Sequence, residues 1–342
     1  MNRNTLVLFL LLLLSGGLVW WLSSDGESAS RDWGPKSNLD FAVDNIEDVR
    51  KVYIIDRSGN APIALEKEEG GDWVLNGSYM PRRSAVDLIM DMVANIQVRN
   101  RPTDESMPHI IESLSTDGIT IEIYGDQDRL LRKYVVGGVT KDNDANFVIM
   151  DGSNEPFVCN LRHFVGNIRG RLEKPSFEDW RDLAVFDYEP DRIAEVSIEY
   201  PKQRDKSFVL RREGKASFTV APYYDLTFQP EVSATNQSLA EAWLEYFDRI
   251  PGEAFLNDFV HRERIQSMVP FAVVTVVTRD GDTREARFYP TMEYDPVEDQ
   301  FYHHQTEAFY RYWVSLDSGD FMLVQMPQVK EIFRGYGNFV KN

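Results

Sequence analysis

The residue pattern best suited to metal chemistry is a group of histidines and carboxylates in the C-terminal part of the chain. His303 and His304 follow closely after Asp295, Glu298 and Asp299. A zinc site requires three or four ligands that converge on one point, but neighbouring residues of a strand point to opposite faces of the sheet. The sequence therefore favours a solvated acidic hairpin, and we predict no metal site.

A second acidic pattern, Asp142-x-Asp144-x-Asn146, resembles the start of a calcium-binding loop. An EF-hand loop continues with a glycine directly after these positions and ends with a glutamate at its twelfth position. This chain has Phe147 and Ser153 at those two places. The pattern therefore favours a polar hairpin turn over a calcium site.

Cys159, the single cysteine, is the remaining candidate for covalent chemistry. A nucleophilic cysteine requires a base that stabilises its thiolate, and His163 follows in the next few residues. The run Phe157-Val158-Cys159 instead favours a small buried side chain in a strand. No P-loop, GxGxxG, GxSxG or HExxH motif is present. We therefore predict no catalytic residue and no cofactor, and a protein that is not an enzyme.

Composition limits the classes of partner. The 342 residues include 37 basic and 55 acidic side chains, for a net charge of −18. Nucleic-acid binding requires clusters of Lys and Arg that neutralise phosphates, so this balance argues against it. The chain is 43% hydrophobic and 12% aromatic, enough to build packed cores. At roughly 100–200 residues per domain, the length predicts two domains.

Two stretches with the same helical spacing predict a duplication. Apolar residues follow one helical face over residues 85–96 and again, with identical spacing, over residues 239–250. Ser84 and Ser238 precede the two faces, where we expect them to cap the helices.

Short β-rich runs precede each of these helices and indicate an antiparallel meander. They are residues 52–55, 63–65 and 73–75 in the first half, and residues 194–198, 208–210 and 218–220 in the second.

The sequence thus predicts an α+β fold of two tandem repeated modules, each a mainly antiparallel sheet with a packed amphipathic helix. The first module is expected at residues 40–172, a linker at 173–186 and the second module at 187–342. Their largest difference is an insertion at residues 292–311, where the first module has the short segment 139–146. Function is often carried by loops of this kind on a rigid scaffold.

An aromatic series runs through and beyond this insertion. Its members are Phe301, Tyr302, Phe309, Tyr310, Tyr312 and Trp313. Aromatic residues in strands commonly form core or cross-strand pairs, but those on a module-specific insertion could also stack on sugars or contact a partner protein. We select Tyr302, Phe309 and Tyr310 as contact residues, because aromatic side chains are enriched at interface hot spots.

Residues 1–22 begin with a short positively charged end and continue as an uncharged apolar run. We predict that the first part is a cytoplasmic end and the second a transmembrane anchor, which the two modules follow in the chain. Trp20 and Trp21 fall where an interfacial aromatic belt belongs, and we include them among the contact residues. Residues 23–39 are expected to form a flexible stalk. The positive-inside rule then predicts a single-pass protein of the bacterial inner membrane with its bulk outside the cytoplasm. A cleaved signal peptide, with a small-residue site at residues 28–30, is the alternative.

Four short motifs carry a likeness to a known family. They are Val49-x-Lys51-Val52-x-Ile54, Trp73-Val74-Leu75-Asn76-Gly77, Tyr134-Val135-Val136-Gly137-Gly138 and Trp180-Arg181-Asp182-Leu183. On these motifs the chain resembles the bacterial domain-of-unknown-function family 4340, best over residues 40–200. It departs from the Gly-Leu-x-x-Pro form that the family often has before the strand beginning here at Gly118-Ile119. The resemblance implies an extracytoplasmic auxiliary protein, often encoded beside ABC-type export components similar to those associated with gliding motility, and it implies no catalytic residues.

Three functions from different classes remain open. We favour a non-enzymatic, membrane-anchored extracytoplasmic accessory subunit of an envelope assembly, with integral membrane proteins as partners. The resemblance points to subunits of an ABC-type transporter. The alternative is a surface module that binds a glycan or peptide through the aromatic insertion. A hydrolase is disfavoured because the catalytic motifs are missing.

Overall fold

The computed structural model describes residues 39–57, 61–224, 234–295, 297–298, 300–302 and 310–340. The chain divides into two compact units, residues 1–181 and 182–342. This division falls inside the predicted linker, residues 173–186.

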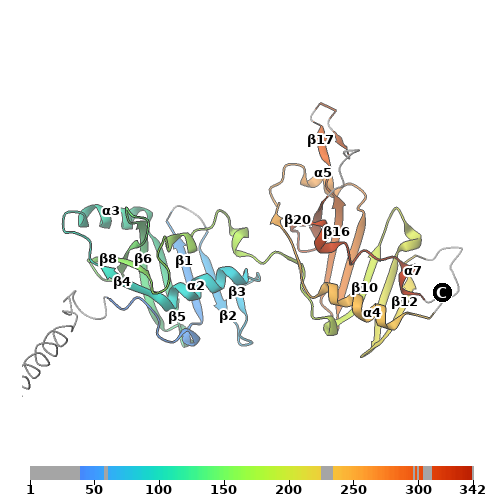
Figure 1. Cartoon of the computed structure of the whole chain (residues 1–342), viewed down its shortest axis with the longest axis horizontal. Coiled ribbons are helices and arrows are strands. Elements are labelled where there is room, and N and C mark those ends of the chain that lie inside the picture. The colour runs from blue at the N-terminus through green and yellow to red at the C-terminus, as the bar shows by residue number, and fades with distance from the viewer. Residues whose placement is uncertain are drawn as a thin grey trace, which may run out of the picture. The chain divides into compact units, whose positions relative to one another are not determined.

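The first unit is built on an eight-stranded antiparallel sheet with the order β3-β2-β1-β5-β6-β7-β8-β4 (Figure 1). Strand β5 shows why these segments are strands, since Ile119, Ile121 and Ile123 are buried and alternate with half-buried residues. The strand bounds are β1 (Lys51–Asp56), β2 (Ile63–Lys67), β3 (Trp73–Leu75), β4 (Ile96–Asn100), β5 (Ile119–Tyr124), β6 (Leu130–Val139), β7 (Asn146–Met150) and β8 (Pro156–Leu161).

The second unit repeats this arrangement. Its eight-stranded sheet has the order β12-β11-β10-β15-β16-β19-β20-β14, so each strand takes the place of its counterpart in the first unit. The strand bounds are β10 (Ile193–Glu199), β11 (Phe208–Gly214), β12 (Ser217–Pro222), β14 (Ala254–Phe255), β15 (Ala272–Thr278), β16 (Thr283–Pro290), β19 (Arg311–Leu316) and β20 (Phe321–Gln325). Strands β9 (Ala184–Phe186) and β13 (Ile250–Pro251) form a separate pair.

Each sheet is covered on both faces. In the first unit, α2 (Arg83–Asn95) buries Ile89, Met92 and Val93 in the main core, while α3 (Met107–Asp117) packs on β6. In the second unit, α4 (Gln237–Leu244) buries Trp243 in the main core. The short α5 (Arg262–Gln266) buries Ile265 in a smaller cluster. The remaining helices are α6 (Met326–Val329) and α7 (Tyr336–Phe339).

The duplication extends to the segment that closes each module. The Arg82 N–H donates a 2.7 Å hydrogen bond to the Trp180 carbonyl, and the Asn236 N–H donates one of 2.7 Å to the Phe339 carbonyl. Arg82 and Asn236 stand directly before α2 and α4, while Trp180 and Phe339 end η5 (Phe177–Trp180) and α7. Trp180 and Phe339 are therefore counterparts, and both rings are buried.

The predicted α+β class is wrong. The described residues form mainly antiparallel β-structure, and helices are few and short. The helical periodicity is a strong signal in the sequence, yet the two helices that it predicts, α2 and α4, comprise only 13 and 8 residues. Strands dominate because most of each core is supplied by the inward-facing residues of an eight-stranded sheet.

Details of the two helices also differ from the prediction. Ser84 and Ser238 are not the N-caps: α2 begins after Arg82 without a side-chain cap, and the Asn236 side chain caps α4 by accepting a hydrogen bond from the Leu239 N–H. Leu88 belongs to the apolar face predicted over residues 85–96, which we expected to be buried, but it is 38% exposed. The buried stripe of α2 is thus rotated slightly away from Leu88.

The predicted membrane anchor, residues 1–22, lies outside the described residues together with Trp20 and Trp21. Among the residues that the structure does describe, no helix has the length and apolar character needed to cross a bilayer. The predicted transmembrane signal anchor and the predicted single-pass inner-membrane location therefore have no support among the described residues.

Candidate functional site

The predicted insertion forms a two-stranded hairpin on the second module. Strands β17 (Glu293–Asp295) and β18 (Gln300–Tyr302) pair antiparallel, and Tyr302 lies opposite Glu293. In Figure 1 this hairpin, labelled β17, stands out beyond the end of the main sheet. The corresponding connection of the first module, between β6 and β7, is the short turn at residues 140–145. At equivalent positions of the two sheets, the first module therefore has a tight turn and the second has a projecting hairpin.

The root of the hairpin is held by an ion pair and backbone hydrogen bonds. The Arg311 guanidinium contacts both carboxylate oxygens of Glu253, at 2.7 and 3.0 Å. The Thr291 N–H donates to the Arg311 carbonyl at 3.1 Å, and the Met326 N–H donates to the Tyr310 carbonyl at 2.7 Å. The hydrogen bonds from Arg311 lower the pKa of Glu253, which keeps this carboxylate ionised. The hairpin thus starts from a fixed base.

The predicted contact residues fall on this hairpin or outside the described part of the chain. Tyr302 lies on β18, and Tyr310, at the root, is 63% exposed. Phe309, like Trp20 and Trp21, is outside the described residues. Within the described residues, Tyr302 and Tyr310 are therefore the members of the predicted set that the structure places on this projection.

Other aromatic residues of the series belong to the core. Tyr312 and Trp313 are buried on opposite faces of β19. Trp313 packs with Ile265, Tyr289 and Phe321 beneath the segment that contains α5. These residues support the base of the hairpin and do not form an exposed contact surface.

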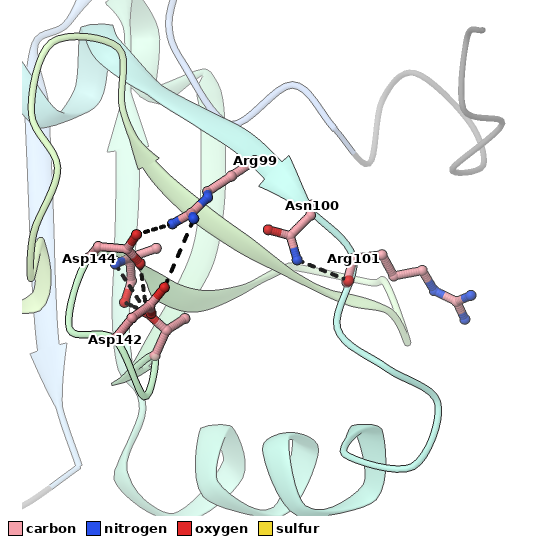
Figure 2. Close-up of polar contacts among 7 residues, drawn as sticks. Arg99, Asn100, Arg101, Asp142 and Asp144 are labelled. Atoms are coloured by element: carbon pink, nitrogen blue, oxygen red, sulfur yellow. Dashed lines mark hydrogen bonds and ion pairs between the residues drawn. The ribbon is translucent and has the colours of Figure 1, made fainter.

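The Asp142-x-Asp144-x-Asn146 pattern is a hairpin turn joined to an arginine (Figure 2). The Arg99 guanidinium forms an ion pair with Asp144, and its Nη2 lies 3.9 Å from Asp142. Arg99 reaches this turn because it is an extra residue in β4, at the irregularity of the β4–β8 register between Val98 and Asn100.

The third member of that pattern has a structural role. Asn146 is fully buried, and its amide donates hydrogen bonds of 3.1 Å to the Gly137 carbonyl and to Asn167 Oδ1. Its Oδ1 accepts a 2.8 Å hydrogen bond from the Ile168 N–H. Because its side chain is used in these bonds, Asn146 is not placed as a third calcium ligand beside Asp142 and Asp144.

Cys159 and His163 lie in different environments. Cys159 is fully buried in β8, and burial raises the pKa of its thiol. His163 is exposed, with its Nε2 3.1 Å from Asp91 Oδ1. Partial burial opposes ionisation of Asp91, but Arg171 and His163 outweigh it, so the pKa of Asp91 is lowered. The structure thus pairs His163 with a carboxylate and leaves the cysteine in the core.

His303, His304 and Asp299 of the acidic group lie outside the described residues. Asp295 is on β17 and Glu298 is in the hairpin turn. Across the described ranges, no three His, Cys, Asp or Glu side chains are placed to hold one metal ion.

Two ion pairs that position these features were not identified from the sequence. Arg99 and Asp144 are far apart in the chain, as are Glu253 and Arg311. Neither pair has a local spacing signal, because both form only when the sheet brings distant segments together. Knowledge of the strand order was needed to find them.

Comparisons with known proteins leave the family open. No family model, no curated protein and no solved structure matches this chain. The resemblance to family 4340 therefore stays a prediction.

Proposed function

We propose that this chain is a non-enzymatic accessory subunit that binds another protein through the projecting hairpin of its second module. The observation that carries the proposal is the difference between two modules of the same strand order. Where the first has a turn tied to Arg99, the second has the β17–β18 hairpin. Loops on a rigid scaffold often carry function, so we place the module-specific function on the loop that is elaborated in the second module.

The chemistry of the hairpin supports a protein contact. Tyr310 offers an exposed aromatic ring, and aromatic residues are enriched among those that contribute most to binding. The Arg311–Glu253 pair and the backbone bonds of Tyr310 hold the root in place, which reduces the entropy lost on binding. Val260 and Val269, on either side of α5, add exposed apolar side chains to this module.

The class of partner comes from the resemblance, which implies subunits of an ABC-type export system. The net charge of −18 favours a partner with a positively charged surface. Such a partner would associate with this chain faster and more selectively than a neutral or acidic one.

A loop exchange tests this proposal. Residues 292–310 are replaced by residues 140–145 of the first module, so that the hairpin becomes the tight turn that the same scaffold already carries. The tagged native chain should co-purify with its partner protein. We expect the exchanged protein to keep the native melting temperature but to recover no partner in the same purification. Tyr246→Ala, which removes another exposed tyrosine of the second module, is the matched control and should keep the partner.

Undiminished recovery of the partner by the loop-exchanged protein would contradict the proposal. If neither form retains a protein but the native chain alone binds on a glycan array, the glycan-binding alternative would replace it.

A further inference from the structure

A small pocket opens in the first module, at the ends of β1 and β2. It has a volume of about 70 Å³ and is lined by Ile54, Ile63 and Trp180 among other apolar residues. A single water needs about 10–15 Å³, and an enclosed cavity of about 150 Å³ binds benzene. Because this pocket is open on one side, it has room for part of a side chain from another molecule.

The second module fills the corresponding place with its own aromatic residues. Ile54 pairs with Ile63 across β1 and β2, and in the same register Ile198 pairs with Phe208 across β10 and β11. Phe208 is fully buried, and its ring centroid lies 4.9 Å from that of Phe339, the counterpart of Trp180. The smaller Ile63 therefore stands where the second module has a phenylalanine.

A second replacement lies at the rim. Asp56 lines the pocket two residues after Ile54, and the residue two after Ile198 is Tyr200. The Tyr200 ring is buried, and its hydroxyl donates a 2.7 Å hydrogen bond to the Arg334 carbonyl. One module thus has an open pocket with a carboxylate at its rim, and the other has a tyrosine of its own at that position.

The residues that line the pocket are suited to binding an aromatic side chain from a positively charged segment of another protein. Phe177 and Trp180 supply aromatic surface, and the Lys174 ammonium lies 5.7 Å from the centroid of the Trp180 ring. Asp56 and Glu173 place carboxylates in the lining, with Glu173 held 2.6 Å from Arg169 Nε. The lining thus carries two carboxylates and one ammonium group. The net charge of −18 on the whole chain favours a basic partner over an acidic one.

We infer that this pocket binds a tyrosine side chain presented by a partner protein, with basic residues next to the tyrosine in the partner's sequence. The ring would occupy part of the space that Phe208 and Tyr200 together fill in the second module. This inference does not rest on the function proposed for the hairpin, which lies in the other module.

The test follows isoleucine methyl signals of the full chain by NMR during titration with p-cresol, the tyrosine side-chain analogue. Ile54 and Ile63 methyl signals, assigned through Ile→Val variants, should shift and saturate. Two variants then introduce the residues of the second module: Ile63→Phe and Asp56→Tyr. Each should abolish the shift of the Ile54 signal. Ile111→Phe, at an exposed residue of α3 that does not line the pocket, is the matched control and should retain it.

Two capped tripeptides test the charge requirement. Lys-Tyr-Lys should bind several-fold more tightly than Glu-Tyr-Glu at low salt, and added salt should reduce the difference. Absence of any Ile54 or Ile63 shift with p-cresol would overturn the inference, as would equal shifts in the Asp56→Tyr protein, provided that its spectrum is otherwise native. Tighter binding of Glu-Tyr-Glu would overturn the assignment of a basic partner.

Discussion

The Arg311 guanidinium binds both carboxylate oxygens of Glu253, at 2.7 and 3.0 Å, and so joins the root of the projecting hairpin to the segment just before β14. The two residues lie far apart in the sequence, and the contact exists because the second sheet brings β14 and β19 to the two sides of β20.

We expect Glu253→Gln to loosen the hairpin root with little effect on the rest of the module. An exposed ion pair of this kind contributes little to global stability, because solvent screens its charges. Hydrogen–deuterium exchange of the amides of Thr291 and Arg311 should be faster in the variant, while amides in β15 stay as protected as before. Unchanged exchange at Thr291 would show that the backbone bonds alone fix the root.

The same pair predicts a pH dependence. The pKa of Glu253 is lower in the folded chain than in the unfolded chain. Its contribution to stability is therefore fully present above the unfolded-state pKa and is lost as the pH falls through the folded-state pKa. Between pH 7 and pH 3, native protein should lose more stability than Glu253→Gln does, measured by denaturant unfolding. Equal losses in the two proteins would contradict this assignment.

Truncating two neighbouring residues of α2 should lower the free energy of unfolding by very different amounts. Ile89 is fully buried and Leu88 is 38% exposed. Ile89→Ala should lower the free energy of unfolding of the first module by about 2–5 kcal/mol, because it leaves a cavity in the core. Leu88→Ala should cost under about 1 kcal/mol. Similar losses for both would mean that the helix is rotated relative to the structure described.

In the second module, Trp243 joins α4 to the C-terminal segment. Its indole Nε1 donates a 3.2 Å hydrogen bond to the Ile332 carbonyl, and its ring packs on Phe208 and Phe339. Trp243→Ala should cost about 3–5 kcal/mol in denaturant unfolding. Tyr246→Ala, at a 45% exposed ring three residues later, should change stability by no more than about 0.5 kcal/mol. A mild Trp243→Ala phenotype would contradict the central packing role of this ring.

The buried cysteine should react only when its module opens. Burial raises the pKa of the Cys159 thiol, so little thiolate is present at pH 8. We expect Ellman's reagent to modify native protein slowly, at a rate that rises with denaturant, and unfolded protein at once. Rapid modification of native protein would mean that β8 is accessible from solvent.

Local patterns predicted several strands correctly but not the fold class. The β-rich runs at residues 63–65 and 73–75 are confirmed as parts of β2 and β3. The apolar stripe assigned to the first helix, however, continues into a strand, since α2 ends at Asn95 and Ile96 begins β4. When the first strand residue after a helix faces the core, it continues the apolar spacing of the helix in the sequence. Periodicity alone therefore cannot show where the helix ends and the strand begins.

The candidate site could be predicted only in part for a similar reason. The insertion is visible in the sequence because the two halves can be aligned, and Tyr310 follows from it as an exposed aromatic residue. The partners that hold the site, such as Glu253 for Arg311, depend on strand order. So does the pocket beside Trp180, which becomes visible only when Ile63 and Phe208 are seen to occupy the same register.

Site-specific photocrosslinking most directly tests whether the hairpin contacts a partner. A benzophenone amino acid replaces Tyr310 in the full chain in its native cells, with the same replacement at Tyr246, another exposed tyrosine of the second module, as the control. We predict that irradiation yields a discrete protein adduct from position 310 and none from position 246. An adduct from position 246 with none from position 310 would contradict the proposed role of the hairpin.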